Sequence, residues 1–194
     1  MRAPAILLLA AGASRRMRGA DKLLLMIEGR PLLARMAARA LDTGYPVFVT
    51  LPEGEGPRRA ALEGLKITPV AVANPGRGMS ASIRAGIGAL PPGTPAALIM
   101  LADMPEITTS DLDALLAASA RTGHQRIIRA TAEDGTPGNP VLFPARLFSA
   151  LKALHGDQGA RALMKQGNPL PVPLPGRHAL IDLDTPEDWQ AWQG

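Results

Sequence analysis

Short runs of apolar residues alternate along the chain with segments in which apolar residues recur every three or four positions. The short runs are typical of buried strands, and the longer periodic segments are typical of helices. We expect strands at residues 5–10, 46–51, 67–73, 96–101, 125–131, 140–143 and 179–183. The runs at 5–10 (AILLLA) and 96–101 (AALIML) contain no polar side chain. This pattern indicates parallel strands that are buried on both faces of a sheet.

Helical spacing links the predicted strands. Apolar residues recur at this spacing from Leu32 to Leu41 and from Met79 to Leu90, where a Pro-Pro-Gly stretch follows. A helix is expected at 110–120, where Thr108 and Asp111 are spaced as the capping box at its start. Thr185 and Asp188 have the same spacing and predict the start of a last helix. A further helix is expected from Asp157 to Lys165, and the proline-rich segment 169–175 suits an edge strand or a loop.

The alternation of strands and helices predicts an α/β fold of three layers, Rossmann-like, with a mostly parallel sheet. No internal repeat and no linker rich in Gly, Pro or Ser divides the chain. We therefore expect one domain over residues 1–194. The carboxyl ends of the parallel strands are the edge at which such sheets bind ligands.

Composition narrows the classes of function. The chain is 46% hydrophobic and 20% charged, as a folded globular protein is, and it has no cysteine, which excludes disulfides and thiolate metal sites. Its net charge of +4 is scattered, and only 3% of its residues are aromatic, so a small anionic ligand is favoured over nucleic acid. The apolar run at 3–13 ends in charged residues and is too short to span a membrane, so we interpret it as a buried first strand. With eight Met and no Cys, we expect a protein of the reducing cytoplasm.

The loop after the first strand is the first candidate site. Small residues at 10–13 let backbone N–H groups approach a phosphate chain, and Ser14 adds a hydroxyl group. Arg15, Arg16 and Lys22 add charged donors. The glycine patterns of dinucleotide-binding folds and of P-loop enzymes are absent. The alternative is an ordinary turn with solvated arginines.

Asp103 is the second candidate, because it follows the apolar strand 96–101 almost directly. Magnesium takes one or two protein carboxylates together with phosphate oxygens and water, which a single Asp at this edge would suit. Asp182 and Asp184 are not needed to cap the last helix and could supply a second metal carboxylate. The alternative for Asp103 is a strand-ending turn before Pro105.

The third candidate is the glycine-rich turn at 74–82 (NPGRGMSAS), which opens a helix. The helix N-terminus at Gly78 and Met79 could hold an anion, and Asn74, Ser80 and Ser82 could bond a base or a ribose. The alternative is a structural turn with Ser80 as the helix cap. The three histidines have no metal-ligand spacing, and we interpret them as solvated loop residues.

These segments together resemble the nucleotidyltransferase family that completes molybdenum cofactors, and within it the cytidylyltransferase branch. The matching segments are ILLLAAGASRRM, DKLL, NPGRGMSASIRAGI, LADMP, GTPGNPVLF, LHGDQGARAL and IDLDTPED. The resemblance implies a fold related to glycosyltransferase A and Mg²⁺-dependent transfer of CMP from CTP to the terminal phosphate of molybdopterin. The wording Leu-Ala-Ala-Gly is similar to the cytidylyltransferase branch, whereas the guanylyltransferase branch usually has Leu-Ala-Gly-Gly.

The resemblance also assigns residues. It implies that Arg15, Lys22 and Asp103 are catalytic, that Asp103 holds magnesium, and that residues up to about 105 bind the nucleotide. The nucleotide-binding candidates are Leu9, Ala10, Ala11, Gly12, Ala13, Ser14, Arg15, Lys22, Asn74, Gly78, Met79, Ser80 and Ser82. In the half from about 106 onward, the acceptor-binding candidates are Asn139, Gly156, Asp157 and Arg161.

Three other functions stay open at this point. The same fold could act on a sugar or polyol phosphate or use GTP, or the chain could deliver cofactor without catalysis. Nucleic-acid binding is a weaker alternative, since the chain has no basic cluster. A molybdoenzyme or its chaperone would receive the product of a cytidylyltransferase.

Overall fold

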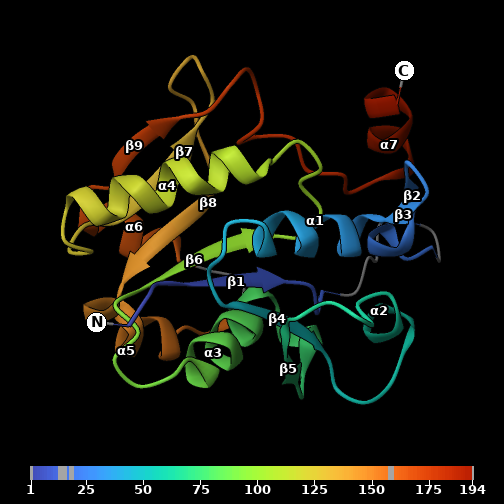
Figure 1. Cartoon of the computed structure of the whole chain (residues 1–194), viewed down its shortest axis with the longest axis horizontal. Coiled ribbons are helices and arrows are strands. Elements are labelled where there is room, and N and C mark those ends of the chain that lie inside the picture. Colours follow the sequence, from blue (N-terminus) through green and yellow to red (C-terminus); the bar gives the residue numbers. More distant parts are fainter. Residues whose placement is uncertain (1, 13–16, 18–19, 157–159, 194) are drawn as a thin grey trace.

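The computed structural model describes residues 2–12, 17, 20–156 and 160–193. Seven strands of the described residues form the central sheet, in the order β5-β4-β1-β6-β8-β7-β9 (Figure 1). Their bounds are β1 Ala5–Leu9, β4 Val47–Pro52, β5 Thr68–Val72, β6 Ala96–Leu101, β7 Ile128–Thr131, β8 Pro137–Pro144 and β9 Leu170–Pro173. Neighbouring strands are parallel except that β8 runs antiparallel to both β6 and β7. The sheet is therefore mostly parallel, as the sequence predicts.

Helices lie on both faces of this sheet (Figure 1). The α-helices are α1 Leu32–Leu41, α2 Pro57–Ala60, α3 Met79–Ala89, α4 Thr109–Arg121, α5 Phe148–Lys152, α6 Arg161–Gly167 and α7 Pro186–Gln193. Short 3-10 helices are η2 Lys22–Leu24, η3 Pro75–Arg77 and η4 Ala145–Leu147, and a two-stranded hairpin pairs β2 Met26–Ile27 with β3 Arg30–Pro31. In Figure 1, α1 and α4 cover one face of the sheet, and α3 and α5 cover the other.

The purely apolar strand β1 is buried on both faces. Ile6 and Leu8 belong to the apolar cluster that includes α1 and α4, whereas Leu7 and Leu9 belong to the cluster that includes α3 and α5. Successive side chains of a strand point to opposite faces, so a strand between two helical layers needs apolar residues at every position. The three-layer α/β prediction is confirmed.

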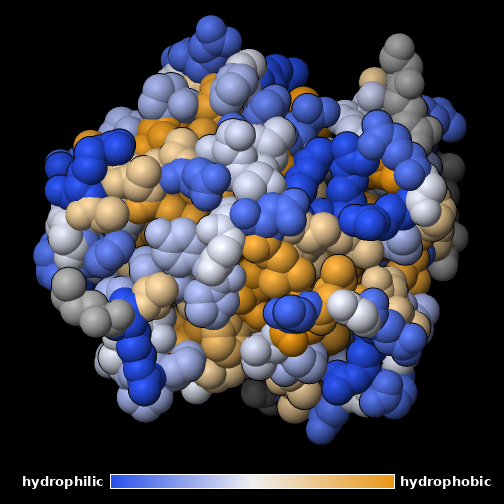
Figure 2. Space-filling view, in the orientation of Figure 1, coloured by the Kyte–Doolittle hydropathy of each residue, from blue (hydrophilic) through white to orange (hydrophobic). Residues whose placement is uncertain are grey.

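The surface of the molecule carries both hydrophilic and apolar residues. Figure 2 shows hydrophilic residues interspersed with apolar ones on the face that Figure 1 presents. In the part of the chain that the structure describes, no helix is both long enough and apolar enough to cross a membrane.

Both predicted capping boxes are present. Asp111 N–H donates to Thr108 Oγ1 at 3.2 Å, and Thr108 N–H donates to Asp111 Oδ2 at 2.9 Å. At α7, Asp188 N–H donates to Thr185 Oγ1 at 3.1 Å, and Thr185 N–H donates to Asp188 Oδ2 at 2.8 Å. These bonds satisfy helix donors that have no partner inside the helix. The segment at 169–175 contains β9, which forms one edge of the sheet.

The prediction of a strand at 179–183 is wrong. This segment is a turn followed by irregular chain, because it bonds to two different elements instead of to one neighbouring strand. Asn139 N–H donates to Ala179 O at 2.9 Å, and Leu183 N–H donates to Asp103 O at 3.0 Å. The side chains of Ala179 and Leu183 are nevertheless buried, so the apolar pattern reflects packing and not strand pairing.

The helix expected from Asp157 begins later, at Arg161, with Ala160 at its N-cap position. Asp157, the residue predicted to cap this helix, lies outside the described residues. The helix reaches Gly167, beyond the predicted end at Lys165, because Asn168 adopts the left-handed conformation (φ +42°) that ends it.

Candidate active site

Three charged side chains meet at the carboxyl end of β6. Lys22 Nζ donates a hydrogen bond to Asp103 and another to Asp184 Oδ1 at 2.6 Å. Lys22 opens η2, Asp103 lies two residues beyond β6, and Asp184 precedes α7. The bond from Leu183 N–H to Asp103 O ties these last two segments together. The structure thus brings together a predicted catalytic lysine and two of the predicted metal carboxylates.

The electrostatics of this cluster favour cations. Burial alone would lower the pKa of Lys22, but the charges of Asp103 and Asp184 and their hydrogen bonds outweigh it and raise this pKa. Partial burial raises the pKa of Asp182, and the negative charges of Asp184 and Asp103 raise it further. Two carboxylates therefore share one ammonium group, with the charge of Asp182 nearby, and the cluster can accept further positive charge.

Asp103 has the feature that a metal ligand needs. Its Oδ1 atom is buried and has no hydrogen-bond partner among the described residues. A buried carboxylate oxygen without a partner is costly, and a divalent cation would relieve that cost. The described part of the chain holds no group of three or more His, Cys, Asp or Glu side chains that could bind a metal by itself. The residues fit a magnesium ion that arrives with phosphate oxygens and takes Asp103, with Asp184 or Asp182, as protein ligands.

The loop after β1 lies against the start of α3. Leu9 ends the strand, Ala10 and Ala11 are buried, and Gly12 is exposed. Ala10 N–H donates to Thr50 O at 3.1 Å, and Ala11 packs in an apolar cluster with Val72 and Ala81. This cluster places the first and third candidate segments side by side.

Three nucleotide-binding candidates of this loop, Ala13, Ser14 and Arg15, lie outside the described residues. Their role in holding phosphates stays a prediction.

The glycine-rich turn leads into α3 as expected, but its side chains differ in exposure. Gly78 (φ +80°) is the N-cap of α3, so Ser80 is not the cap. Asn74 and Met79 are exposed, whereas Ser80 and Ser82 are buried. Asn74 and Met79 are therefore accessible to a ligand, and the roles of the two serines in nucleotide binding stay predictions.

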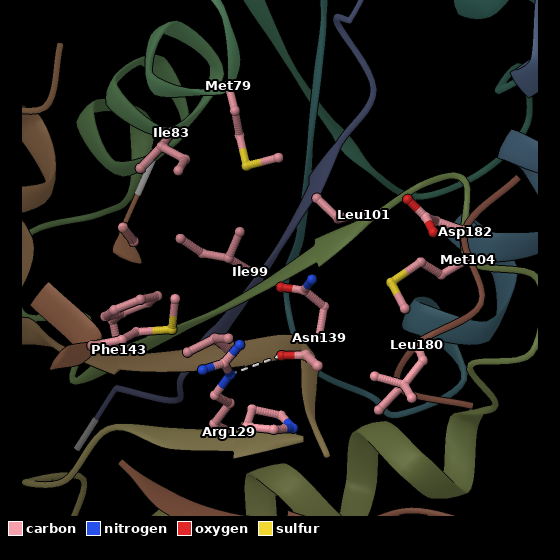
Figure 3. A pocket seen from close by; sticks show the side chains of 16 residues that line it. Met79, Ile83, Ile99, Leu101, Met104, Arg129, Asn139, Phe143, Leu180 and Asp182 are labelled. Atoms are coloured by element: carbon pink, nitrogen blue, oxygen red, sulfur yellow. Dashed lines mark hydrogen bonds between the residues drawn. The ribbon is translucent and has the colours of Figure 1, made fainter. Parts of the chain in front are cut away.

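A cavity of about 440 Å³ lies between α3, β6, β8 and the 179–182 segment (Figure 3). Apolar side chains form most of its wall, and Asn139 points into its middle, with Asp182 at one side (Figure 3). The apolar lining residues include Met79, Ile83, Ile99, Leu101, Met104 and Phe143. Leu101 and Met104, which flank Asp103 along the chain, and Asp182, two residues before Asp184, all line the cavity, so it lies beside the charged cluster.

The other acceptor candidates have different positions. Ala160 and Met164, at the start and in the middle of α6, line the cavity, which brings the helix that Arg161 begins to the cavity wall. Gly156 is exposed and is not among the lining residues. Sequence reasoning missed Arg58, which is buried beside the loop after β1, because one arginine in a Gly- and Pro-rich stretch gives no signal.

Gly138 allows the close approach that shapes one wall of this cavity. A Cβ atom at Gly138 would lie 2.0 Å from Ala179 O, which is backbone and cannot move aside alone. We expect Gly138→Ala to lower the free energy of unfolding by about 2 kcal/mol, as overpacking does. Urea denaturation measures this change. Gly88→Ala is the control, because a Cβ there meets nothing within 4 Å and should be neutral or stabilising; equal effects of the two substitutions would contradict the close approach.

Comparisons with known proteins agree with this architecture. Residues 6–170 match the family described as a MobA-like NTP transferase domain. The purine catabolism protein PucB of Bacillus subtilis is 28% identical over 97% of this chain and 96% of its own length. A molybdenum cofactor guanylyltransferase of Bradyrhizobium sp. ORS 278 is 37% identical over 75% of this chain and 68% of its own. The crystal structure of Rv0371c from Mycobacterium tuberculosis superposes with a TM-score of 0.83, at 25% identity over 98% of this chain and 97% of that one.

Proposed function

This chain belongs to the MobA-like NTP transferase family and is a nucleotidyltransferase, and from that premise we propose that it transfers CMP from CTP to the terminal phosphate of molybdopterin. One observation supports this proposal above the others. The cluster of Lys22, Asp103 and Asp184 lies beside a cavity that is large enough for a small organic acceptor. A charged centre for phosphates next to an acceptor pocket is the arrangement that nucleotidyl transfer requires.

The proposed reaction needs no covalent intermediate with the enzyme. An oxygen of the acceptor phosphate attacks the α-phosphorus of CTP, and the bond from that phosphorus to the β-phosphate oxygen breaks, which releases pyrophosphate. A phosphate oxygen is already ionised near neutral pH, so no general base is required. His124 contacts Ser119 and His178 contacts Asp111, so each of these two histidines already has a protein partner, and the reaction does not need either as a general base.

The chain's own residues would position the reactants and stabilise charge. Lys22 keeps its ammonium charge because its pKa is raised, so it can neutralise a phosphate group. Asp103 would hold Mg²⁺ together with Asp184 or Asp182, and the ion would neutralise triphosphate charge when bound. The loop after β1 would present backbone N–H groups to the phosphates.

Asn139 is proposed to recognise the acceptor. Its side chain is half-buried and points into the middle of the cavity, which Arg129 and Asp182 also line (Figure 3). We expect Asn139→Ala to raise the KM for the acceptor about tenfold, because one polar contact is lost. The KM for CTP should stay within about twofold, as steady-state kinetics with each substrate varied will show.

Asn74→Ala is the matched comparison, because it makes the same truncation on the proposed nucleotide side. It should raise the KM for CTP and leave the KM for the acceptor unchanged. An Asn139→Ala variant that loses affinity for CTP and acceptor equally would contradict the assignment of the cavity to the acceptor.

The base and the acceptor are tested by a panel of CTP, GTP, ATP and UTP with molybdopterin, with pyrophosphate release as the readout. The Leu-Ala-Ala-Gly segment at 9–12 supports CTP, whereas the Bradyrhizobium relative is named as a guanylyltransferase, which makes GTP the alternative. We expect the highest kcat/KM with CTP. A preference for GTP would show that the transferred nucleotide carries guanine and not cytosine. Turnover with only a sugar or polyol phosphate would show that the acceptor is not molybdopterin. No turnover with any acceptor would favour a protein that delivers the cofactor without catalysis.

A further inference from the structure

Arg58 of α2 is buried against the start and the end of the segment that joins β1 to η2. Only 8% of this residue is exposed. Its Nη1 atom donates to the carbonyl oxygens of Ala10 and Gly12, both at 2.7 Å. Its Nε and Nη2 atoms donate to the two carboxylate oxygens of Asp21, at 2.6 and 2.9 Å. One guanidinium group therefore holds both ends of the 10–21 segment.

These contacts constrain the groups on which phosphate binding would depend. Within a peptide unit the C=O and the following N–H point in opposite directions, so a fixed carbonyl also fixes the next N–H. Bonding the carbonyl of Ala10 therefore orients the N–H group of Ala11, and bonding the carbonyl of Gly12 holds that residue in place. At the other end, Asp21 Oδ1 also accepts from Leu23 N–H at 3.1 Å, which anchors the 3-10 turn that begins with Lys22.

We propose that Arg58 is a positioning residue for the nucleotide: it fixes residues 10–12 at the start of the loop and the turn of Lys22 in the arrangement that receives the triphosphate. This inference rests on the proposed function, in which that loop binds the phosphates. Arg58 acts through the loop, since its Nε, Nη1 and Nη2 atoms all donate to protein oxygens. The planar, five-donor fork of arginine is essential here, because a lysine could place its charge near Asp21 but could not hold both carbonyls and both carboxylate oxygens.

The test compares Arg58→Lys with Arg59→Ala. Arg58→Lys keeps the charge, and Arg59 is the adjacent arginine, partly exposed and paired with the exposed Glu55. Calorimetry of CTP binding with Mg²⁺ and without acceptor is the first measurement, and the KM for the acceptor is the second. We expect Arg58→Lys to weaken CTP binding at least about tenfold and to leave the acceptor KM unchanged, while Arg59→Ala changes neither. Asp21→Asn removes the charge of the partner and should weaken CTP binding in the same direction.

The outcomes separate the two proposals. If the wild-type protein binds no nucleoside triphosphate, the proposed function fails. If the wild type binds CTP and Arg58→Lys and Asp21→Asn bind it equally well, the positioning role of Arg58 is wrong. A parallel loss of CTP and acceptor affinity together with a lowered Tm would also overturn it, because a purely structural residue gives that result.

Discussion

Asp103→Asn is expected to lower kcat for nucleotidyl transfer by at least about a hundredfold, while the protein still folds because Lys22 keeps its ion pair with Asp184. The amide keeps the size of the side chain but removes the charge that would hold Mg²⁺ and Lys22. Asp103 Oδ1 is buried and has no partner among the described residues, so its local environment offers no protein donor that could replace a metal. The measurement is kcat at saturating CTP and acceptor over a range of Mg²⁺ concentrations.

Asp113→Asn is the control, because it makes the same change at an exposed position of α4 that is not part of the charged cluster. It should leave kcat unchanged. A near-wild-type kcat of Asp103→Asn at saturating Mg²⁺ would show that Asp103 is not the metal ligand.

Lys22→Met is expected to have the second largest effect. Loss of its ammonium group should reduce kcat/KM for CTP by about a hundredfold, since no other described side chain donates to both Asp103 and Asp184. The same change leaves these two carboxylates without their shared counter-charge. The free energy of unfolding at pH 7, without ligands, should therefore fall by about 2 kcal/mol.

The pH dependence of that stability loss follows from the raised pKa of Lys22. A lysine with a raised pKa stabilises the folded state at every pH below its ordinary pKa, and this contribution is lost only as the pH rises through the raised value. The difference between wild type and variant should thus be constant around neutral pH and should shrink only as the pH rises above the ordinary pKa of lysine. Urea denaturation between pH 7 and pH 11 would measure it.

Magnesium gives a readout of the same variant without turnover. On the proposed function, Mg²⁺ would have to compete with the Lys22 ammonium group for Asp103 and Asp184 in the wild type, whereas in Lys22→Met this competition would be absent. We therefore expect Mg²⁺ alone to raise the Tm of Lys22→Met more than that of the wild type. Lys66→Met, on an exposed lysine, is the control and should respond as the wild type does. Equal Mg²⁺-induced shifts in all three proteins would contradict a shared cation site.

The sequence predicts the sheet and its functional edge because those features depend on local patterns. The apolar run at 96–101 has to be buried on both faces, and a carboxylate soon after it has to lie at the carboxyl edge of the sheet. Asp103 is therefore predictable without a structure. The same holds for Thr185 and Asp188, whose three-residue spacing dictates a capping box that is present.

Other features depend on contacts between distant segments, which no local pattern encodes. The apolar residues at 179–183 suit a strand, but Asn139 and Asp103 each take one backbone bond from the segment and keep it irregular. Arg58 resembles any surface arginine in sequence, and its importance depends on the carbonyls of Ala10 and Gly12, which the fold brings to it. The sequence predicts Lys22 as a phosphate-binding residue. It does not predict the contacts of Lys22 with Asp103 and Asp184, because these depend on how the chain folds.

One measurement tests nucleotidyl transfer at this site most directly. CTP labelled at the α-phosphorus and CTP labelled at the γ-phosphorus are each incubated with the protein, Mg²⁺ and molybdopterin, and the products are separated. We predict that the α-label appears in the acceptor and that the γ-label leaves entirely as pyrophosphate, with both events at least about a hundredfold slower in Asp103→Asn. Transfer of the γ-label to the acceptor, or release of inorganic phosphate without pyrophosphate, would contradict it.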